Sequence, residues 1–232
     1  MKKTILANIF LLIGLICAYG QKTDGKKLFT ESFYQDSCIF KTSGENMYFI
    51  LEPDYQLTLQ GVDGKDSVKL VITVLNETKK IGNVDTRIVE ENESVNGKTV
   101  EISRNYFAFC VQTSSMFYFG EEVDIYKDGK IVNHDGAWVA EGKNKAGIGM
   151  PGLFLLGSRY YQEIAPGVAM DRAEIMSISD SLKTPCGMFR NCLKTEEGTA
   201  LNSKEKEYKI YAPGVGLLKD EELLLVKYGY VK

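Results

Sequence analysis

Histidine is the scarcest catalytic residue type in this 232-residue chain, which contains only His134. A zinc site built from several histidines is therefore excluded, and any Ser-His-Asp or Cys-His arrangement would have to use this one imidazole. His134 precedes the turn pair Asp135-Gly136, and no Gly-x-Ser-x-Gly motif is present. We interpret His134 as a polar residue at the end of a strand and assign no catalytic residue.

Basic clusters and phosphate-binding loops are also absent. The 28 Lys and Arg residues are outnumbered by 31 Asp and Glu, which gives a net charge of −3. Because nucleic-acid binding needs clustered Lys and Arg, we expect no nucleic-acid partner. No Gly-x-Gly-x-x-Gly motif follows a predicted strand, and no phosphate-binding Gly-x-x-x-x-Gly-Lys-Ser/Thr loop is present. The aspartates near Asp128 do not have the spacing of a calcium loop. We therefore expect no cofactor and no bound metal.

The longest apolar run lies at the N-terminus and has the features of a secretory signal. Lys2 and Lys3 precede it, and small residues around Tyr19 predict cleavage after Gly20. The run is shorter than the ~20 residues that span a bilayer, so we expect no transmembrane segment in the mature chain. Cys17 does not lie in a lipidation motif, because bulky Ile16 stands directly before it, where the motif needs Gly, Ala or Ser. We expect an exported, periplasmic or extracellular protein without a lipid anchor.

Four cysteines remain after the signal is removed: Cys38, Cys110, Cys186 and Cys192. In an oxidising compartment they allow two disulfides and three pairings. Cys186 and Cys192 can pair only if the chain turns between them, for instance at Gly187, because one continuous strand would hold them ~20 Å apart. The redox spacing C-x-x-C is absent, so we interpret the four as structural disulfide partners or buried free thiols.

The rest of the chain alternates apolar and polar residues with a period of two, which predicts strands. Leu70, Ile72 and Val74, for example, share one face of a predicted strand, with Lys69 and Thr73 on the other. Asp-Gly and Asn-Gly pairs at 63–64, 96–97 and 128–129 are typical of tight hairpins. Further strands are predicted at 160–164, 172–177, 189–195, 208–212, 216–218 and 223–228.

Segments with helical periodicity are scarce, and the glycine-rich stretch 140–157 is predicted to be a loop. The sequence therefore predicts an all-β fold of successive antiparallel hairpins, either curved and barrel-like or a sandwich, with few helices. We expect a single exported domain over residues 21–232, with residues 21–35 loosely ordered.

Four motifs follow one another along the predicted strands: YFGEEVDIYKDGK at 118–130, YYQEIAPGVA at 160–169, CLKT at 192–195 and YAPGVGL at 211–217. In this order they resemble a group of uncharacterised exported bacterial β-rich proteins of similar size. The resemblance spans roughly residues 55–228 and implies an envelope or secreted protein. It implies no activity, site residue or disulfide pairing. A looser similarity to envelope lipoprotein carriers is an analogy of architecture only.

Aromatic residues are concentrated in the predicted hairpins. Consecutive aromatics such as those at 117–119 must face both sides of a strand, so one side can line a cavity or an exposed patch instead of the core. The candidate binding residues are Tyr118, Tyr126, Trp138, Tyr160 and Tyr161.

These features favour non-catalytic binding or carriage of an apolar or sugar-like ligand. The first alternative is a structural or assembly partner in the cell envelope. The second is a carboxylate-based hydrolase that uses two of Glu163, Asp171 and Glu174, which lie close in sequence around a turn. An enclosed cavity favours carriage, a flat aromatic patch favours a protein partner, and convergent carboxylates favour hydrolysis.

Overall fold

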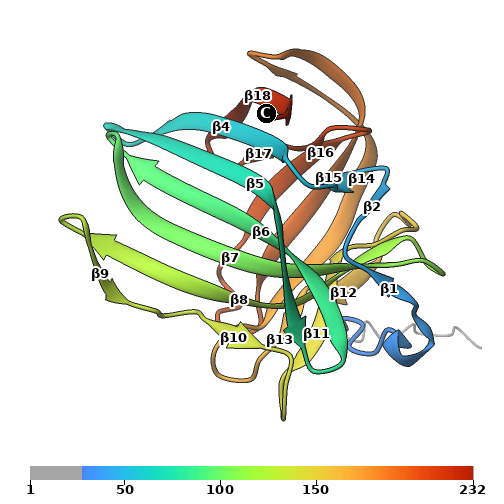
Figure 1. The fold of residues 1–232 in the computed structure, drawn as a ribbon. Helices are drawn as coiled ribbons and strands as arrows, with labels where there is room; N and C mark the ends of the chain where they lie inside the picture. The colour runs from blue at the N-terminus through green and yellow to red at the C-terminus, as the bar shows by residue number, and fades with distance from the viewer. Residues whose placement is uncertain (1–27, 232) are drawn as a thin grey trace, which may run out of the picture.

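The computed structural model describes residues 28–231, which form β-strands and the turns and loops between them (Figure 1). The helical content of this range is one three-residue 3-10 turn, η1 (Gln35–Ser37). No helix within residues 28–231 has the length and apolar character needed to cross a bilayer. The predicted secretory signal at 1–20, together with residues 21–27, lies outside the described residues.

Eighteen strands follow η1 in the described part of the chain. Several are longer than the sequence pattern predicts: β14 continues to Thr184, and β15 begins at Gly187 and continues to Thr199. The strands are β1 Phe40–Lys41, β2 Gly44–Asn46, β3 Phe49–Leu51, β4 Tyr55–Asp63, β5 Asp66–Ile81, β6 Val84–Val95, β7 Lys98–Cys110, β8 Ser115–Lys127, β9 Lys130–Asn133, β10 Trp138–Val139, β11 Lys145–Met150, β12 Arg159–Tyr161, β13 Glu163–Ile164, β14 Asp171–Thr184, β15 Gly187–Thr199, β16 Glu207–Ala212, β17 Gly216–Asp220 and β18 Leu223–Tyr230.

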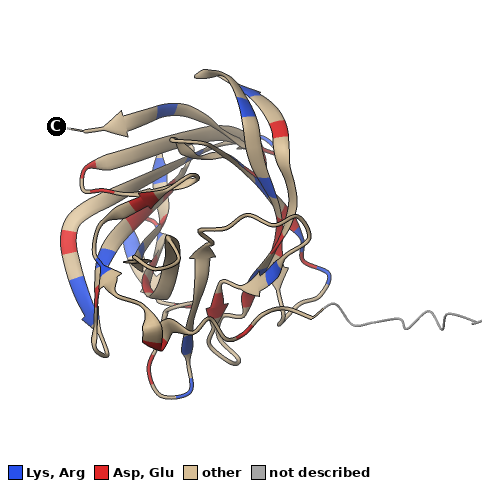
Figure 2. Ribbon diagram, turned by 90° about the vertical axis from the view of Figure 1, so that its right-hand side faces the viewer, with Lys and Arg blue, Asp and Glu red and all other residues tan. Residues whose placement is uncertain are grey.

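One antiparallel sheet contains all of these strands except the separate β2–β3 hairpin. Most neighbours in the sheet are neighbours in the chain, but β18 pairs with β4 and so joins the last strand to the first long one. The order of strands in the sheet runs from β12 to β13. Between these two strands, Gln162 N donates to the Asp171 carbonyl oxygen at 2.8 Å. The sheet thus nearly closes into a barrel (Figure 2). The predicted all-β hairpin fold is confirmed, and its shape is barrel-like.

Tight turns connect the long strands where Asn-Gly and Asp-Gly pairs predict them. Asn96 and Gly97 have φ values of 51° and 78°, and Asp128 and Gly129 have 53° and 75°. Positive φ at both central residues matches the turn type whose twist suits a β-hairpin. The predicted turn at 63–64 is shifted by one residue, since Asp63 still pairs within the ladder.

The predicted loop at 140–157 is only partly a loop, because it contains β11, which pairs with β8. The prediction fails because glycine here does not break the strand but allows close packing against it. A Cβ at Gly147 would overlap the backbone carbonyl of Gln162, and one at Gly149 would lie 2.7 Å from the Phe107 ring. Glycine in a strand interior often marks such an approach of another chain segment.

The β2–β3 hairpin covers one end of the barrel. Asn46 Nδ2 donates to the carbonyl oxygens of Ser114 (3.1 Å) and Pro151 (3.2 Å), and Gly214 N donates to the Met47 carbonyl oxygen at 2.8 Å. These contacts tie the hairpin to the β7–β8 and β16–β17 turns. Since antiparallel strands alternate in direction, the turns at 64–65, 96–97, 200–206 and 221–222 lie at the opposite end, which we call the open end.

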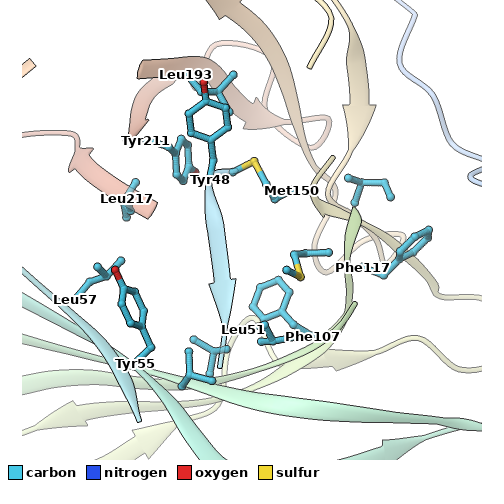
Figure 3. Packing of buried hydrophobic residues seen from close by; sticks show 14 of the residues in the cluster. Tyr48, Leu51, Tyr55, Leu57, Phe107, Phe117, Met150, Leu193, Tyr211 and Leu217 are labelled. Atoms are coloured by element: carbon cyan, nitrogen blue, oxygen red, sulfur yellow. The ribbon is translucent and has the colours of Figure 1, made fainter. Parts of the chain in front are cut away.

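Buried apolar side chains fill the barrel next to this hairpin (Figure 3). Tyr48 points toward Leu193 and Tyr211, and its hydroxyl donates to the Asn191 carbonyl oxygen at 2.9 Å. Leu51, which is completely buried, lies beside Phe107. The core is therefore concentrated toward the covered end.

A disulfide joins Cys38 to Cys110, with their Cα atoms 5.3 Å apart, and fixes the N-terminal segment to β7. Cys186 and Cys192 are free and do not form the second bond that the sequence allowed. The physical reason is the position of the β14–β15 turn, which lies before Gly187 rather than between the two cysteines. The chain from Gly187 to Cys192 runs along β15 and takes Cys192 away from Cys186.

The described part of the segment predicted to be loosely ordered, residues 28–35, is attached to the barrel at Thr30. Thr30 N donates to the Arg159 carbonyl oxygen, and Tyr161 N donates to the Thr30 carbonyl oxygen, both at 3.0 Å. The Phe29 ring also meets the Tyr161 ring edge-on at 6.0 Å. Backbone pairing therefore extends upstream of the long strands.

Candidate functional site

A cavity of about 320 Å³ lies inside the barrel, between the β2–β3 hairpin and the open end. Its walls come from the inner faces of β4–β8 on one side and β14–β17 on the other, with β3, β11 and β13 between them. The volume falls within the range of small-molecule sites, which is about 300–1,000 Å³. The cavity is therefore the candidate functional site.

The half of the cavity near the covered end is apolar and aromatic. The Phe107 ring stacks on Tyr118 with centroids 4.7 Å apart, and Phe49 packs against Phe107 at 5.1 Å. The Tyr55 hydroxyl donates to the Val215 carbonyl oxygen at 2.8 Å, so it presents its ring rather than an unpaired polar group. The other aliphatic and Met residues that line the cavity are Ile50, Leu57, Ile72, Val74, Val89, Met150, Val215 and Leu217.

Toward the open end, the inward-facing residues change from apolar to charged. The change is visible within single strands, because every second residue faces inward: Val89 is followed by Glu91 on β6, and Leu193 by Thr195 and Glu197 on β15. The register of β15–β17 forms successive layers: Leu193, Tyr211 and Leu217, then Thr195, Lys209 and Asp220, then Glu197 and Glu207.

Eight carboxyl residues line this part of the cavity, and we call them the acidic end. Figure 2 shows Asp and Glu in red on strands around the ring. Lys209 is the one cationic side chain among the described residues that line the cavity. The acidic end consists of Glu91, Glu121, Glu163, Asp171, Glu197, Glu205, Glu207 and Asp220.

Lys209 is held by three of these carboxylates. Its Nζ lies 3.4 Å from Glu207 Oε1, 3.5 Å from Asp220 Oδ2 and 3.7 Å from Glu197 Oε2. Burial lowers the pKa of Lys209, but the negative charges of Glu197 and Asp220 outweigh burial and raise that pKa well above its ordinary value. Lys209 is therefore a permanent cation in the site.

Glu197 is the carboxylate with the fullest set of hydrogen bonds. Its Oε1 accepts from Thr195 Oγ1 at 2.8 Å and from the Tyr211 hydroxyl at 3.2 Å, and its Oε2 accepts from Gln162 Nε2 at 3.2 Å. Glu197, Glu207 and Asp220 share Lys209, the one cationic side chain among the described residues that line the cavity.

Glu91, Glu121 and Glu163 have strongly raised pKa values. Burial is the main cause for all three; it raises the pKa of Glu91 to about 7 and, with the negative charge of Glu91, the pKa of Glu121 to about 8. For Glu163, burial comes first and the charges of Asp171 and Glu121 add to it. Like charges that share a buried site favour the protonated forms.

Glu163 also has an oxygen without a hydrogen-bond partner. Its side chain is only 5% exposed, and no hydrogen bond from the described residues reaches Oε2. The Asp171 carboxyl group and the Trp138 indole N–H both lie close enough to act on the pKa of Glu163, Asp171 by raising it and Trp138 by lowering it. Neither forms a hydrogen bond of normal geometry to Oε2. Glu163 therefore lies at the cavity wall beside Asp171 and Trp138, with one carboxyl oxygen that accepts no hydrogen bond of normal geometry from the described residues.

The sequence-predicted binding residues do not form one site. Tyr118 lines the cavity, and its hydroxyl donates to Asn105 Oδ1 at 2.6 Å. Trp138 is buried behind it, edge-on at 5.5 Å. Tyr160 is buried in the barrel core, Tyr161 packs on Phe29 at a separate surface groove, and Tyr126 is half-buried on β8 near β9.

The polar candidates separate in the same way. Glu163 and Asp171 lie together at the acidic end, whereas Glu174 forms an ion pair with Arg159 at 2.8 Å and does not line the cavity. His134 is exposed, with Nδ1 2.7 Å from the Val123 carbonyl oxygen and 3.0 Å from Asp124 Oδ1, and it does not line the cavity either. The remaining acidic residues of the cavity were not selected from the sequence.

The carboxyl groups of the cavity surround a space rather than a point. Within the described part of the chain, no group of three or more His, Cys, Asp or Glu side chains is arranged to hold a metal ion. Comparison with known proteins gave no matching family model, no matching curated protein and no matching solved structure.

Proposed function

We propose that this chain binds and carries a small amphiphilic molecule in the cavity of its barrel. The observation that supports this function is the two-part lining: aromatic and aliphatic side chains at the covered end and carboxyl groups toward the open end. Such a cavity can bury an apolar body while it holds one polar group in a defined position. A flat aromatic patch for a partner protein fits this arrangement less well.

We also propose that the protein acts outside the cytoplasm. The Cys38–Cys110 disulfide supports this location, because such bonds persist in oxidising compartments. The order of charged, apolar and small residues at the N-terminus favours export as well. Carriage of an amphiphile between membranes or to the cell surface would then be its role.

The test uses N-phenyl-1-naphthylamine, a neutral probe at pH 7 whose fluorescence rises in apolar surroundings. We expect saturable binding to the full mature protein and loss of binding in Ile72→Trp, which fills the apolar half of the cavity. Lys69→Trp is the matched control, because Lys69 is exposed and does not line the cavity. Unchanged probe fluorescence, together with no small molecule retained in native mass spectrometry, would contradict the proposal.

A second candidate is acid–base hydrolysis of a glycoside, favoured by one specific observation. Glu163 and Asp171 lie close enough for each to affect the pKa of the other, and both pKa values are raised mainly by burial. A pair of carboxyl groups in different protonation states is the arrangement that glycosidases use. Hydrolysis of a nitrophenyl glycoside that is lost in Glu163→Gln would support this candidate; no turnover across a broad panel would remove it.

A further inference from the structure

The charge balance of the cavity carries information about the polar group of its ligand. Eight carboxyl residues line the cavity against one lysine, and Lys209 is already shared by three of them. Among the described residues, no ion pair to Lys or Arg is formed by Glu91, Glu121 or Glu163. The carboxyl groups of the site therefore outnumber its cations. Those without a cation carry an uncompensated negative charge when ionised, or bind a proton instead.

The second observation is the unpartnered oxygen of Glu163. Its side chain is nine-tenths or more buried, it lines the cavity, and Oε2 receives no hydrogen bond from the described residues. Buried carboxyl oxygens in folded proteins normally accept hydrogen bonds, so the Glu163 carboxyl group, which lies beside Asp171 and Trp138, retains an acceptor position that a donor of the ligand can use. The surplus charge and the free acceptor thus point to the same part of the cavity.

Different ligand groups meet this environment differently. A carboxylate or phosphate would be repelled by the acidic end, and a neutral hydroxyl would supply a donor but no positive charge. A metal ion is not favoured, because no three potential ligands within residues 28–231 are arranged around one point. An organic ammonium group supplies both several N–H donors and a positive charge.

We propose that the ligand of this cavity is an amine: an organic ammonium compound whose N–H groups lie among Glu91, Glu121 and Glu163 and whose apolar body packs against Leu57 and Phe107. The inference rests on the proposed binding function and names the chemical class of the ligand. The ammonium group occupies the acidic end, and the apolar half near the β2–β3 hairpin holds an alkyl chain or a ring of matching size.

The proposal includes a pH dependence, because the carboxyl groups must be ionised to hold a cation. The groups that act on Glu121 are Tyr118, Glu91, Glu101, Glu163 and Asp171, all of them acids. The one cation nearby, Lys209, acts on Glu91 and is itself neutralised by other carboxylates. Amine binding therefore expels protons from the acidic end, and amine affinity rises from about pH 5.5 to pH 8.5, within the range of the raised pKa values.

The experiment compares three molecules with the same alkyl chain: octylamine, 1-octanol and octanoate. Each competes with N-phenyl-1-naphthylamine for the mature protein at pH 7.5. We expect octylamine to bind at least about 10-fold more tightly than 1-octanol, a difference of about 1.4 kcal/mol, and octanoate to bind more weakly than either. Octylamine affinity is expected to fall at least about 10-fold between pH 8 and pH 5.5, whereas the affinity of 1-octanol changes much less.

Substitution identifies the groups responsible. The double variant Glu121→Gln/Glu163→Gln keeps the size of both side chains, and we expect its preference for octylamine over 1-octanol to fall toward one. Glu77→Gln is the matched control, since Glu77 is exposed on β5 and does not line the cavity, and it keeps the preference. Circular dichroism and the melting temperature check that each variant is folded.

Two failures are distinguishable. Binding of the naphthylamine probe with equal affinities for octylamine and 1-octanol, or with a flat pH profile for octylamine, overturns the amine proposal and leaves the binding function standing. Absence of binding by the probe and by all three octyl compounds overturns both. A preference for octylamine that persists in the double variant also overturns the assignment of the ammonium position.

Discussion

Glu121 gives the most direct test of the electrostatics of the cavity, because replacement by Gln removes its charge and keeps its shape. The side chain lies on β8 and lines the cavity, where burial and the neighbouring Glu91 raise its pKa from 4.5 to about 8. We predict that Glu121→Gln stabilises the empty protein at neutral pH. A carboxyl group that contributed a favourable ion pair would show the opposite sign.

The magnitude follows from proton linkage. An acid whose pKa is higher in the folded state stabilises the fold fully below pH 4.5, and this contribution is lost as the pH rises toward 8. Each pH unit in that window corresponds to about 1.4 kcal/mol, so the full loss at pH 7 is about 3.4 kcal/mol. The cavity opens to solvent, which screens the charges, and we therefore expect about 1–3 kcal/mol of stabilisation for Glu121→Gln at pH 7.

The assay is urea unfolding at pH 5, 6, 7 and 8, followed by the fluorescence of the single, buried Trp138. The difference in unfolding free energy between Glu121→Gln and the parent should increase with pH across this range. Glu77→Gln, on the exposed face of β5, should show no such trend. A pH-independent difference, or a Glu121→Gln protein that is less stable at pH 8, would refute the reasoning.

Three further predictions concern the barrel itself. Replacing Cys38 and Cys110 by Ser opens a loop that spans 72 residues, which chain entropy converts to about 4 kcal/mol, and urea unfolding should show a loss of about 2–4 kcal/mol. In the denatured but unreduced chain from residue 21 onward, a thiol reagent should modify two cysteines, Cys186 and Cys192. Modification of no cysteine would indicate a second disulfide. Gly120→Ala should lower the free energy of unfolding by at least about 2 kcal/mol and shift the fluorescence emission of Trp138 to longer wavelength. The reason is that Gly120 has a φ of 134° and that a Cβ there would overlap the Trp138 carbonyl oxygen.

The strands and their turns were predictable from the sequence because their signals are local. Alternation from Leu70 to Val74 and the turn at Asn96-Gly97 depend on a few neighbouring residues, and both are present in the structure. The closure of the barrel was not predictable in this way. It depends on the pairing of β18 with β4, where Tyr228 meets Leu57 across most of the chain, and no local pattern specifies such a contact.

The acidic end was missed for a related reason. In an alternating strand, acidic residues are normally assigned to the solvent-facing side. Glu196 and Glu197 are adjacent on β15; Glu196 pairs with Lys206 on the outside, whereas Glu197 faces the cavity beside Lys209. Which of two neighbouring carboxylates faces inward is decided by the curvature of the closed sheet. The alternation of Leu193, Thr195 and Glu197 showed that these three residues share one face of a strand, but it did not show that this face points into the barrel.

Two explanations for the acidic end make opposite predictions about the same variant. If the carboxyl groups serve the fold, then Glu121→Gln loses stability and leaves ligand preference unchanged. If they serve a cationic ligand, the empty protein carries their electrostatic cost, so Glu121→Gln gains stability and loses preference for the amine. Active and binding sites commonly show this exchange of stability for function. Because Lys209 compensates only part of the charge and Glu163 keeps a buried oxygen unpaired, the second explanation accounts for more of the structure.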